Sequence, residues 1–113
     1  MKERTKKLQF SAKARQAIAD RDGWCIFCQI GYKLPKYSLP GTDIMHIVSR
    51  AQGGLGIEQN GVLGCRYHHH MLDNGNTGDR AAMMEYIEKY MKRFYPDWNR
   101  EDLYYKKGKT NEY

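Results

Sequence analysis

The sequence predicts a small α+β domain that is stapled by a structural zinc ion and flanked by N- and C-terminal helices. A chain of 113 residues builds only a marginal apolar core, so a cross-link is expected. Every cysteine and histidine lies between Cys25 and His70, where a metal site can supply that cross-link. Apolar residues recur at helical spacing in the C-terminal part, whereas the middle of the chain has only short apolar runs between glycines.

The flanking helices are indicated by their caps and by their apolar spacing. Residues 11–20 are expected to form the first helix, which Ser11 can cap. The second helix is expected to begin at Thr77 or Asp79 and to run to Tyr95, where a following proline ends it. Its apolar positions predict a core-facing stripe: Met83, Met84, Ile87, Tyr90, Met91 and Phe94.

Short elements are expected between the two helices. Asp43–Ser49 can form a strand, and Gly61–Gly64 is either a second strand or a buried turn. Arg66–Asp73 can form a short helix that ends at Asn74-Gly75. The glycine-rich stretch 53–56 is expected to be a flexible connection.

A single domain is expected over residues 11–95. Residues 1–10 are basic and are expected to form a mobile arm, and residues 96–113 form a tail to which the sequence assigns no role. No apolar stretch approaches the roughly 18 residues of a membrane span, and the N-terminus lacks the apolar part of a secretory signal. We therefore expect a cytoplasmic protein that contacts no membrane.

The formal net charge is +6, and the basic side chains gather toward the two ends of the chain. A cationic surface favours a polyanionic partner such as DNA, because each cation placed on a phosphate releases condensed counterions. Composition alone supports a merely soluble basic domain equally well. DNA is therefore one of two interpretations of the charge.

Two chelate pairs predict the structural zinc site. Cys25 and Cys28 are separated by two residues, as are Cys65 and His68. Each spacer lets two side chains close on one metal ion from a tight turn, and three thiolates with one imidazole complete a tetrahedral shell. A shell without an open position is typical of a structural ion. Free buried cysteines beside a surface histidine are the alternative, which the presence of two spaced pairs disfavours.

Between these pairs the chain resembles the HNH endonuclease family. A histidine, a Gly-Gly turn, an asparagine and a second histidine follow one another in the order of that family. The framing Cys/His pairs resemble its Cys-rich branch, which is common in phages and bacteria. The resemblance covers residues 20–75 and is carried by DIMHIVSRAQGG at 43–54, Asn60 and LGCRYHH at 63–69.

The resemblance implies a ββα-metal fold, in which a two-stranded hairpin and a helix hold one divalent ion between them. In such a site His46 is the general base that deprotonates water, and His69 binds the ion. Asn60 either orients His46 or ligates the ion, and we favour orientation. The implied activity is hydrolysis of DNA phosphodiesters with Mg²⁺, Mn²⁺, Ni²⁺ or Zn²⁺ as the catalytic ion, beside the structural zinc.

One position departs from the pattern of the family. Many members carry a metal-binding carboxylate or histidine immediately before the catalytic histidine, where this chain has Met45, a poor ligand for a hard cation. Asp43 shares the strand face opposite His46 and is expected to substitute only if the strand bends. His69 and Asp73 are four residues apart and share a helix face, so they are expected to be the main ligands of the catalytic ion.

Two side chains and two further functions are left open by the sequence. Arg50 can clamp a phosphate through its guanidinium or can be a solvated loop residue, and His70 is more simply a surface residue. A zinc-stabilised DNA-binding module without catalysis is the main alternative function, since Met45 can signal a lost activity. A third interpretation is a phage packaging nuclease that acts beside a terminase. DNA specificity and oligomeric state are not encoded in any motif of the chain.

Overall fold

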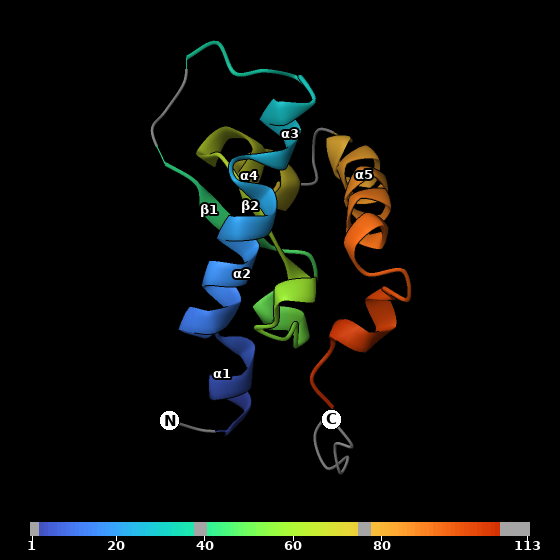
Figure 1. Cartoon of the computed structure of the whole chain (residues 1–113). Helices are drawn as coiled ribbons and strands as arrows, with labels where there is room; N and C mark the ends of the chain where they lie inside the picture. Colours follow the sequence, from blue (N-terminus) through green and yellow to red (C-terminus); the bar gives the residue numbers. More distant parts are fainter. Residues whose placement is uncertain (1–2, 38–40, 75–77, 107–113) are drawn as a thin grey trace.

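The computed structural model describes residues 3–37, 41–74 and 78–106. An antiparallel hairpin and the helix that follows it lie between two longer helices (Figure 1), so the chain is α+β as the sequence predicts. In chain order the elements are α1 (Glu3–Leu8), α2 (Ala12–Asp22), α3 (Ile26–Gln29), β1 (Asp43–His46), η1 (Arg50–Gln52), η2 (Glu58–Asn60), β2 (Gly61–Gly64), α4 (Arg66–Asp73), α5 (Asp79–Phe94) and η4 (Arg100–Leu103).

The hairpin turns one face toward α2 and the other toward the main core. Successive side chains of a strand alternate between its faces. Ile44 and its partner Leu63 pack with apolar residues of α2. Met45 and its partner Val62 enter the larger core, which also contains side chains of α4 and α5. By the same alternation His46 lies on the α2 face, whereas the first residue of β1 lies on the Met45 face.

The predicted helices are present with small shifts at their ends. The Ser11 hydroxyl accepts a hydrogen bond from the Ala14 amide at 3.0 Å and caps α2, which continues through Asp22. The helix α4 has the predicted bounds. The helix α5 begins at Asp79, and its predicted stripe is buried except for Met84, which is half-buried, and Phe94, which is exposed. The alternative start at position 77 and the glycine at position 75 lie outside the described residues.

The strand β1 ends at His46 rather than at the predicted Ser49. The Ile47 amide donates to the backbone carbonyl of Asn60 at 3.0 Å, and the Val48 backbone bonds to the Asn60 side chain. Because the Val48 backbone bonds to the Asn60 side chain instead of to a strand, the pairing of β1 with β2 does not continue past His46. Ser49 then caps η1 instead of extending the strand.

Residues 3–10 pack on the domain, although the charge of residues 1–10 suggests a mobile arm. Residues 3–8 form α1, and Leu8 and Phe10 are buried, with exposed fractions of 2% and 8%. The Lys7 carbonyl also accepts a hydrogen bond from the Gly56 amide at 2.9 Å. Two apolar side chains among the charges therefore hold this segment on the domain.

The described part of the tail also packs on the domain. Leu103 is 2% exposed, and the Tyr105 amide donates to the Gly53 carbonyl at 2.6 Å. The predicted flexible connection is therefore held in place. A side chain at Gly54 would come within 1.8 Å of the Val48 carbonyl oxygen, so only glycine fits this close approach. Residues 107–113 lie outside the described residues.

A buried ion pair joins α2 to the hairpin and to α5. The two carboxylate oxygens of Asp22 accept hydrogen bonds from the Arg21 guanidinium at 2.6 and 2.9 Å. They also accept from the Leu63 amide and the Tyr90 hydroxyl, at 2.8 and 2.7 Å. The Asp22 side chain is fully buried, and it satisfies donors from three elements.

We expect Asp22→Ala to lower the free energy of unfolding by about 3–5 kcal/mol, because the buried Arg21 guanidinium loses its carboxylate partner and the buried Leu63 amide loses its acceptor. Urea unfolding of the metal-loaded protein measures the change. Glu88→Ala is the matched control, since Glu88 forms an exposed pair with Lys92 at 2.9 Å and its loss is expected to cost less than about 1 kcal/mol. Equal unfolding midpoints for the two variants would contradict the role given to Asp22.

Candidate metal centres

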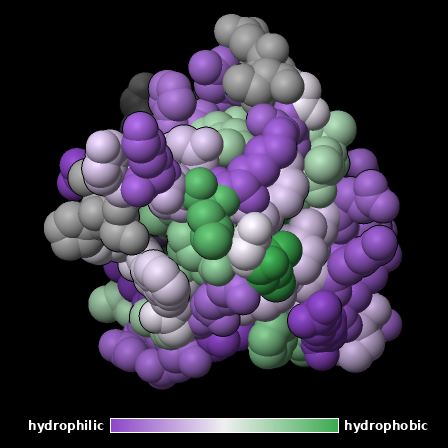
Figure 2. Space-filling model, turned by 90° about the horizontal axis from the view of Figure 1, so that it is seen from above, coloured by the Kyte–Doolittle hydropathy of each residue, from purple (hydrophilic) through white to green (hydrophobic). Residues whose placement is uncertain are grey.

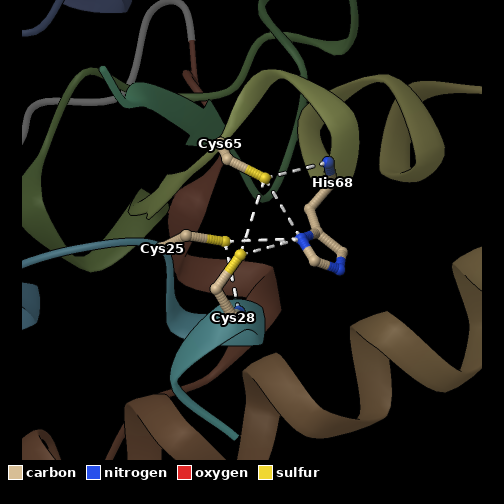
Figure 3. Close-up of side chains that lie close together, drawn as sticks. All are labelled: Cys25, Cys28, Cys65 and His68. Carbon is tan, nitrogen blue, oxygen red and sulfur yellow. Dashed lines mark hydrogen bonds between the residues drawn. The ribbon is translucent and has the colours of Figure 1, made fainter. Parts of the chain in front are cut away.

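Four potential metal ligands converge where α3 and α4 begin. The sulfur atoms of Cys25, Cys28 and Cys65 and an imidazole nitrogen of His68 all lie within 4.8 Å of one another. The three sulfurs surround the His68 Nδ1 atom (Figure 3), at 3.5, 3.6 and 3.2 Å respectively. The two spaced pairs of the sequence are thus assembled into one group that could hold a metal ion, and its composition is consistent with structural zinc.

The spacing of these atoms fits a tetrahedral zinc ion. Zn–S and Zn–N bonds of about 2.3 and 2.0 Å place two sulfurs about 3.8 Å apart and a sulfur and a nitrogen about 3.5 Å apart. The Cys28 and Cys65 sulfurs are 3.8 Å apart, and the sulfur–nitrogen distances lie on either side of the second value. A disulfide, with a bond of about 2.05 Å, does not fit, and all three cysteines are free.

The local sequence explains how each pair is formed. Cys25 and Cys65 are the N-cap residues of α3 and α4, and each sulfur accepts a hydrogen bond at 3.4 Å from the amide three residues later. That later residue is Cys28 in one pair and His68 in the other. The first helical turn therefore brings the second ligand beside the first, and one spacer sets both the cap and the chelate.

A backbone group orients His68. The Nε2 atom lies 2.7 Å from the Tyr32 carbonyl, which can accept its proton and leave Nδ1 for a metal ion. The Tyr32 hydroxyl donates to Asp79 at 3.1 Å, and Lys33 forms an ion pair with the same carboxylate. The loop that holds His68 is thus connected to α5.

Figure 2 shows this end of the molecule as largely hydrophilic, with a few apolar side chains exposed. Leu34 of the loop is 61% exposed.

The Cys28 thiol is protonated at pH 7 in this environment unless a cation is bound beside it. Burial, followed by the neighbouring Cys25 and Cys65 sulfurs, raises the pKa of the Cys28 thiol to about 12. Adjacent thiolates repel one another, so their deprotonation is favourable only with a bound cation. Metal binding at this group is therefore expected to release protons.

A second group of side chains joins β1 to α4. The His69 imidazole lies between two carboxylates, with Nδ1 3.1 Å from Asp43 and Nε2 3.2 Å from Asp73. The His69 side chain is 31% exposed and both carboxylates are more exposed, so the group is open to solvent. The predicted helical pair of His69 and Asp73 is thus joined by a third residue from the hairpin.

Asp43 reaches His69 without the bend in the strand that was expected to be necessary for Asp43 to act as a ligand. Asp43 shares the face of Met45, and this face is the one turned toward α4, so an unbent strand brings it to His69. Met45 itself is fully buried, and its sulfur occupies space that a side chain at Gly64 would fill. The carboxylate missing at position 45 is therefore offered two residues earlier.

The two carboxylates contact opposite nitrogens of one ring, and a histidine binds one ion through one of its nitrogens. A divalent ion at this group would be held either at Nδ1 together with Asp43 or at Nε2 together with Asp73, so the three side chains do not form a single ligand set. In either case the other carboxylate remains a hydrogen-bond acceptor that orients the His69 ring. One carboxylate would thus ligate the ion, and the other would orient the ring.

His46 lies on the other face of the hairpin, half-buried against Phe10. Its Nε2 atom is buried and has no hydrogen-bond partner among the described residues. Burial lowers the pKa of His46 below its ordinary value of 6.5, and the nearby charges of Arg50, His69 and Arg15 lower it further. The imidazole is therefore neutral at pH 7. A neutral imidazole is the form that a general base requires.

Asn60 is fully buried and uses its amide on the backbone. Its oxygen accepts from the Val48 amide at 2.8 Å, and its nitrogen donates to the Val48 and Leu55 carbonyls at 3.1 and 2.7 Å. Within the described structure these bonds hold the loop after His46, rather than the imidazole or an ion as expected. Arg50, the predicted phosphate contact, is exposed on η1, close enough for its charge to affect His46.

Comparison with known proteins does not assign the chain to a family. No family model, no curated protein and no solved structure matches it. Across residues 3–37, 41–74 and 78–106, no helix has both the length and the apolar character needed to cross a membrane. The functional argument therefore depends on the two side-chain groups themselves.

Proposed function

We propose that the protein is a metal-dependent DNA endonuclease that hydrolyses phosphodiester bonds, with His46 as the general base. The observation that carries this proposal is the contact of Asp43, at the start of β1, with His69 of α4, which also contacts Asp73. The same strand ends at His46. Oxygen and nitrogen ligands open to solvent suit metal-assisted hydrolysis, and the neutral imidazole of His46 lies on the other face of the same hairpin, near enough for the charge of His69 to affect it. The net charge of +6 favours a polyanionic substrate.

Each side chain has one task in this proposal. The neutral His46 imidazole takes a proton from a water molecule, whose oxygen forms a bond to phosphorus. The bond from phosphorus to the 3′ oxygen breaks, and the leaving oxygen takes a proton from solvent. His69 with either Asp43 or Asp73 would hold the divalent ion, which would supply positive charge to the reacting phosphate. Arg50 binds a neighbouring phosphate through its guanidinium.

The proposed structural zinc takes no part in the chemistry. Three thiolates and the His68 imidazole leave a zinc ion no open position, and His68 is fully buried. The ion instead ties α3 to α4, and α4 carries His69 immediately after His68. Zinc therefore supports the catalytic group by fixing the helix on which it is built.

Incubation with supercoiled plasmid tests the proposal. We expect the zinc-loaded protein to produce nicked plasmid with Mg²⁺, Mn²⁺ or Ni²⁺, and no product without an added ion. His70→Ala, a change at an exposed histidine beside the group, is expected to leave the rate unchanged. DNA binding in a gel-shift assay, without cleavage under any of the ions, would favour the alternative of a DNA-binding module without catalysis.

The pH dependence of nicking is expected to show an acid limb below pH 6.5. Burial lowers the pKa of His46, so the neutral base persists below its ordinary titration range and is lost only as the pH falls through the lowered pKa. Initial rates measured at saturating metal from about pH 5 to about pH 8, a range that includes the ordinary histidine pKa of about 6.5, would locate this limb. A limb above pH 7 would contradict His46 as the base.

A further inference from the structure

The segment between α1 and α2 lies against the ring of His46. The ring centroids of Phe10 and His46 are 4.4 Å apart, with their planes inclined at 37°. The backbone of Leu8 also lies close enough to the His46 side chain to raise its pKa, against the larger lowering effect of burial. Leu8 and Phe10 are buried, whereas Gln9 between them is exposed. The segment thus turns two apolar side chains inward, and one of them contacts the proposed base.

Two close approaches between glycines and this segment fix its position. A side chain at Gly56 would come within 2.1 Å of the Gln9 carbonyl oxygen. A side chain at Gly61 would come within 2.9 Å of the tip of the Phe10 ring, and Gly61 is the strand partner of His46. The Phe10 ring therefore uses the space left free by a glycine directly opposite His46 in the hairpin.

We propose that Phe10 is a positioning residue for His46, whose ring fixes the orientation of the imidazole and shields it from water. This inference rests on the proposed function, in which His46 is the general base. A base must meet the reacting water at hydrogen-bond distance, so loss of orientation slows the reaction even when substrate binds normally. Because Phe10 is buried and contacts the base, its removal is expected to change kcat and to leave KM unchanged.

The charged groups around His46 come from other elements. They are Arg15 on α2, Arg50 on η1 and His69 on α4, and each lowers the pKa of His46, after burial as the first cause. Phe10 carries no charge, so its contribution can be separated from theirs. Its truncation admits water to the ring, weakens the effect of burial and is expected to raise the pKa of His46 toward 6.5.

The test compares Phe10→Ala with Leu63→Ala. Both substitutions remove a buried side chain from the same small cluster of Phe10, Ala14, Ile18 and Leu63. Leu63 lies opposite Ile44 in the hairpin, whereas His46 lies opposite Gly61. We expect Phe10→Ala to lower kcat about 10- to 100-fold with KM unchanged, and Leu63→Ala to keep kcat within a few-fold. Phe10→Leu keeps apolar volume without the ring, and it is expected to recover part of the loss.

Two results would overturn the proposal: a kcat for Phe10→Ala no lower than that of Leu63→Ala, or a kcat above that of the wild type, which would make Phe10 a cover rather than a support. NMR titration of His46 in the zinc-loaded protein gives a readout that needs no cleavage. If the protein proves not to be a nuclease, a raised His46 pKa in Phe10→Ala alone still supports the contact, and equal shifts in both variants refute it. Should Phe10→Ala not fold, Phe10→Leu enters the same comparisons in its place.

Discussion

His68→Ala is expected to be unfolded at 25 °C in the absence of excess zinc. Structural zinc contributes about 10–16 kcal/mol to the folding of small zinc domains, whereas the net stability of a typical domain is about 5–15 kcal/mol. Loss of the imidazole removes one of four ligands from a buried group and leaves the Cys25 and Cys65 thiols facing a cavity. Far-ultraviolet circular dichroism and the zinc content of the purified chain measure the outcome.

His70→Ala provides the matched control for this prediction. His70 lies on the same helix, two residues further along, and is exposed. This variant is expected to hold one zinc ion per chain and to keep the dichroism of the wild type. A His68→Ala protein that still retains one zinc ion and its full dichroism would show that the Cys/His group does not staple the fold.

His69→Ala is expected to leave the fold and the zinc content intact and to slow plasmid nicking at least about 100-fold. Its side chain is partly exposed and contacts the carboxylates rather than the zinc group, so stability is largely spared. A catalytic divalent ion supplies several kcal/mol of transition-state stabilisation, and each 1.4 kcal/mol is about tenfold in rate. Adjacent histidines of α4 would thus separate folding, at His68, from chemistry, at His69.

Substitution of each carboxylate in turn identifies the nitrogen of His69 at which the ion binds. If the ion binds at Nδ1, Asp43→Asn loses more activity than Asp73→Asn, and the order is reversed for an ion at Nε2. The weaker effect then identifies the carboxylate that orients the ring, whose loss typically costs about 10- to 100-fold. Nicking rates of both variants near that of the wild type would remove the group from the mechanism.

The group of Cys25, Cys28, Cys65 and His68 was predictable from the sequence because the geometry of each ligand pair is local. Each pair of ligands is set by one helical turn that begins at a cysteine, so the spacing of two residues is enough to identify it. Only the meeting of the two pairs depends on the fold. The same reasoning predicted α4 with its observed bounds and the cap of α2 at Ser11.

The position of Asp43 and the contact of Phe10 with His46 depend on long-range packing. Which strand face meets α4 is decided by the pairing of β1 with β2, which no short motif specifies. The apolar residues Leu8 and Phe10 are surrounded by basic ones, so a count of charges concealed their burial. Glycines 54 and 56 suggested flexibility, although close backbone approaches require them.

The proposed role of His46 as the base in phosphodiester hydrolysis is tested most directly by the rate at which the wild type and His46→Ala nick supercoiled plasmid. Both proteins should be compared at equal zinc content and equal dichroism, with Mn²⁺ and Mg²⁺ as the added ions. We expect nicking by the wild type and a rate lower by about 10²–10⁴-fold in the variant, the usual contribution of a positioned base. Equal rates for the two proteins, or no nicking by the wild type with any divalent ion, would contradict the account.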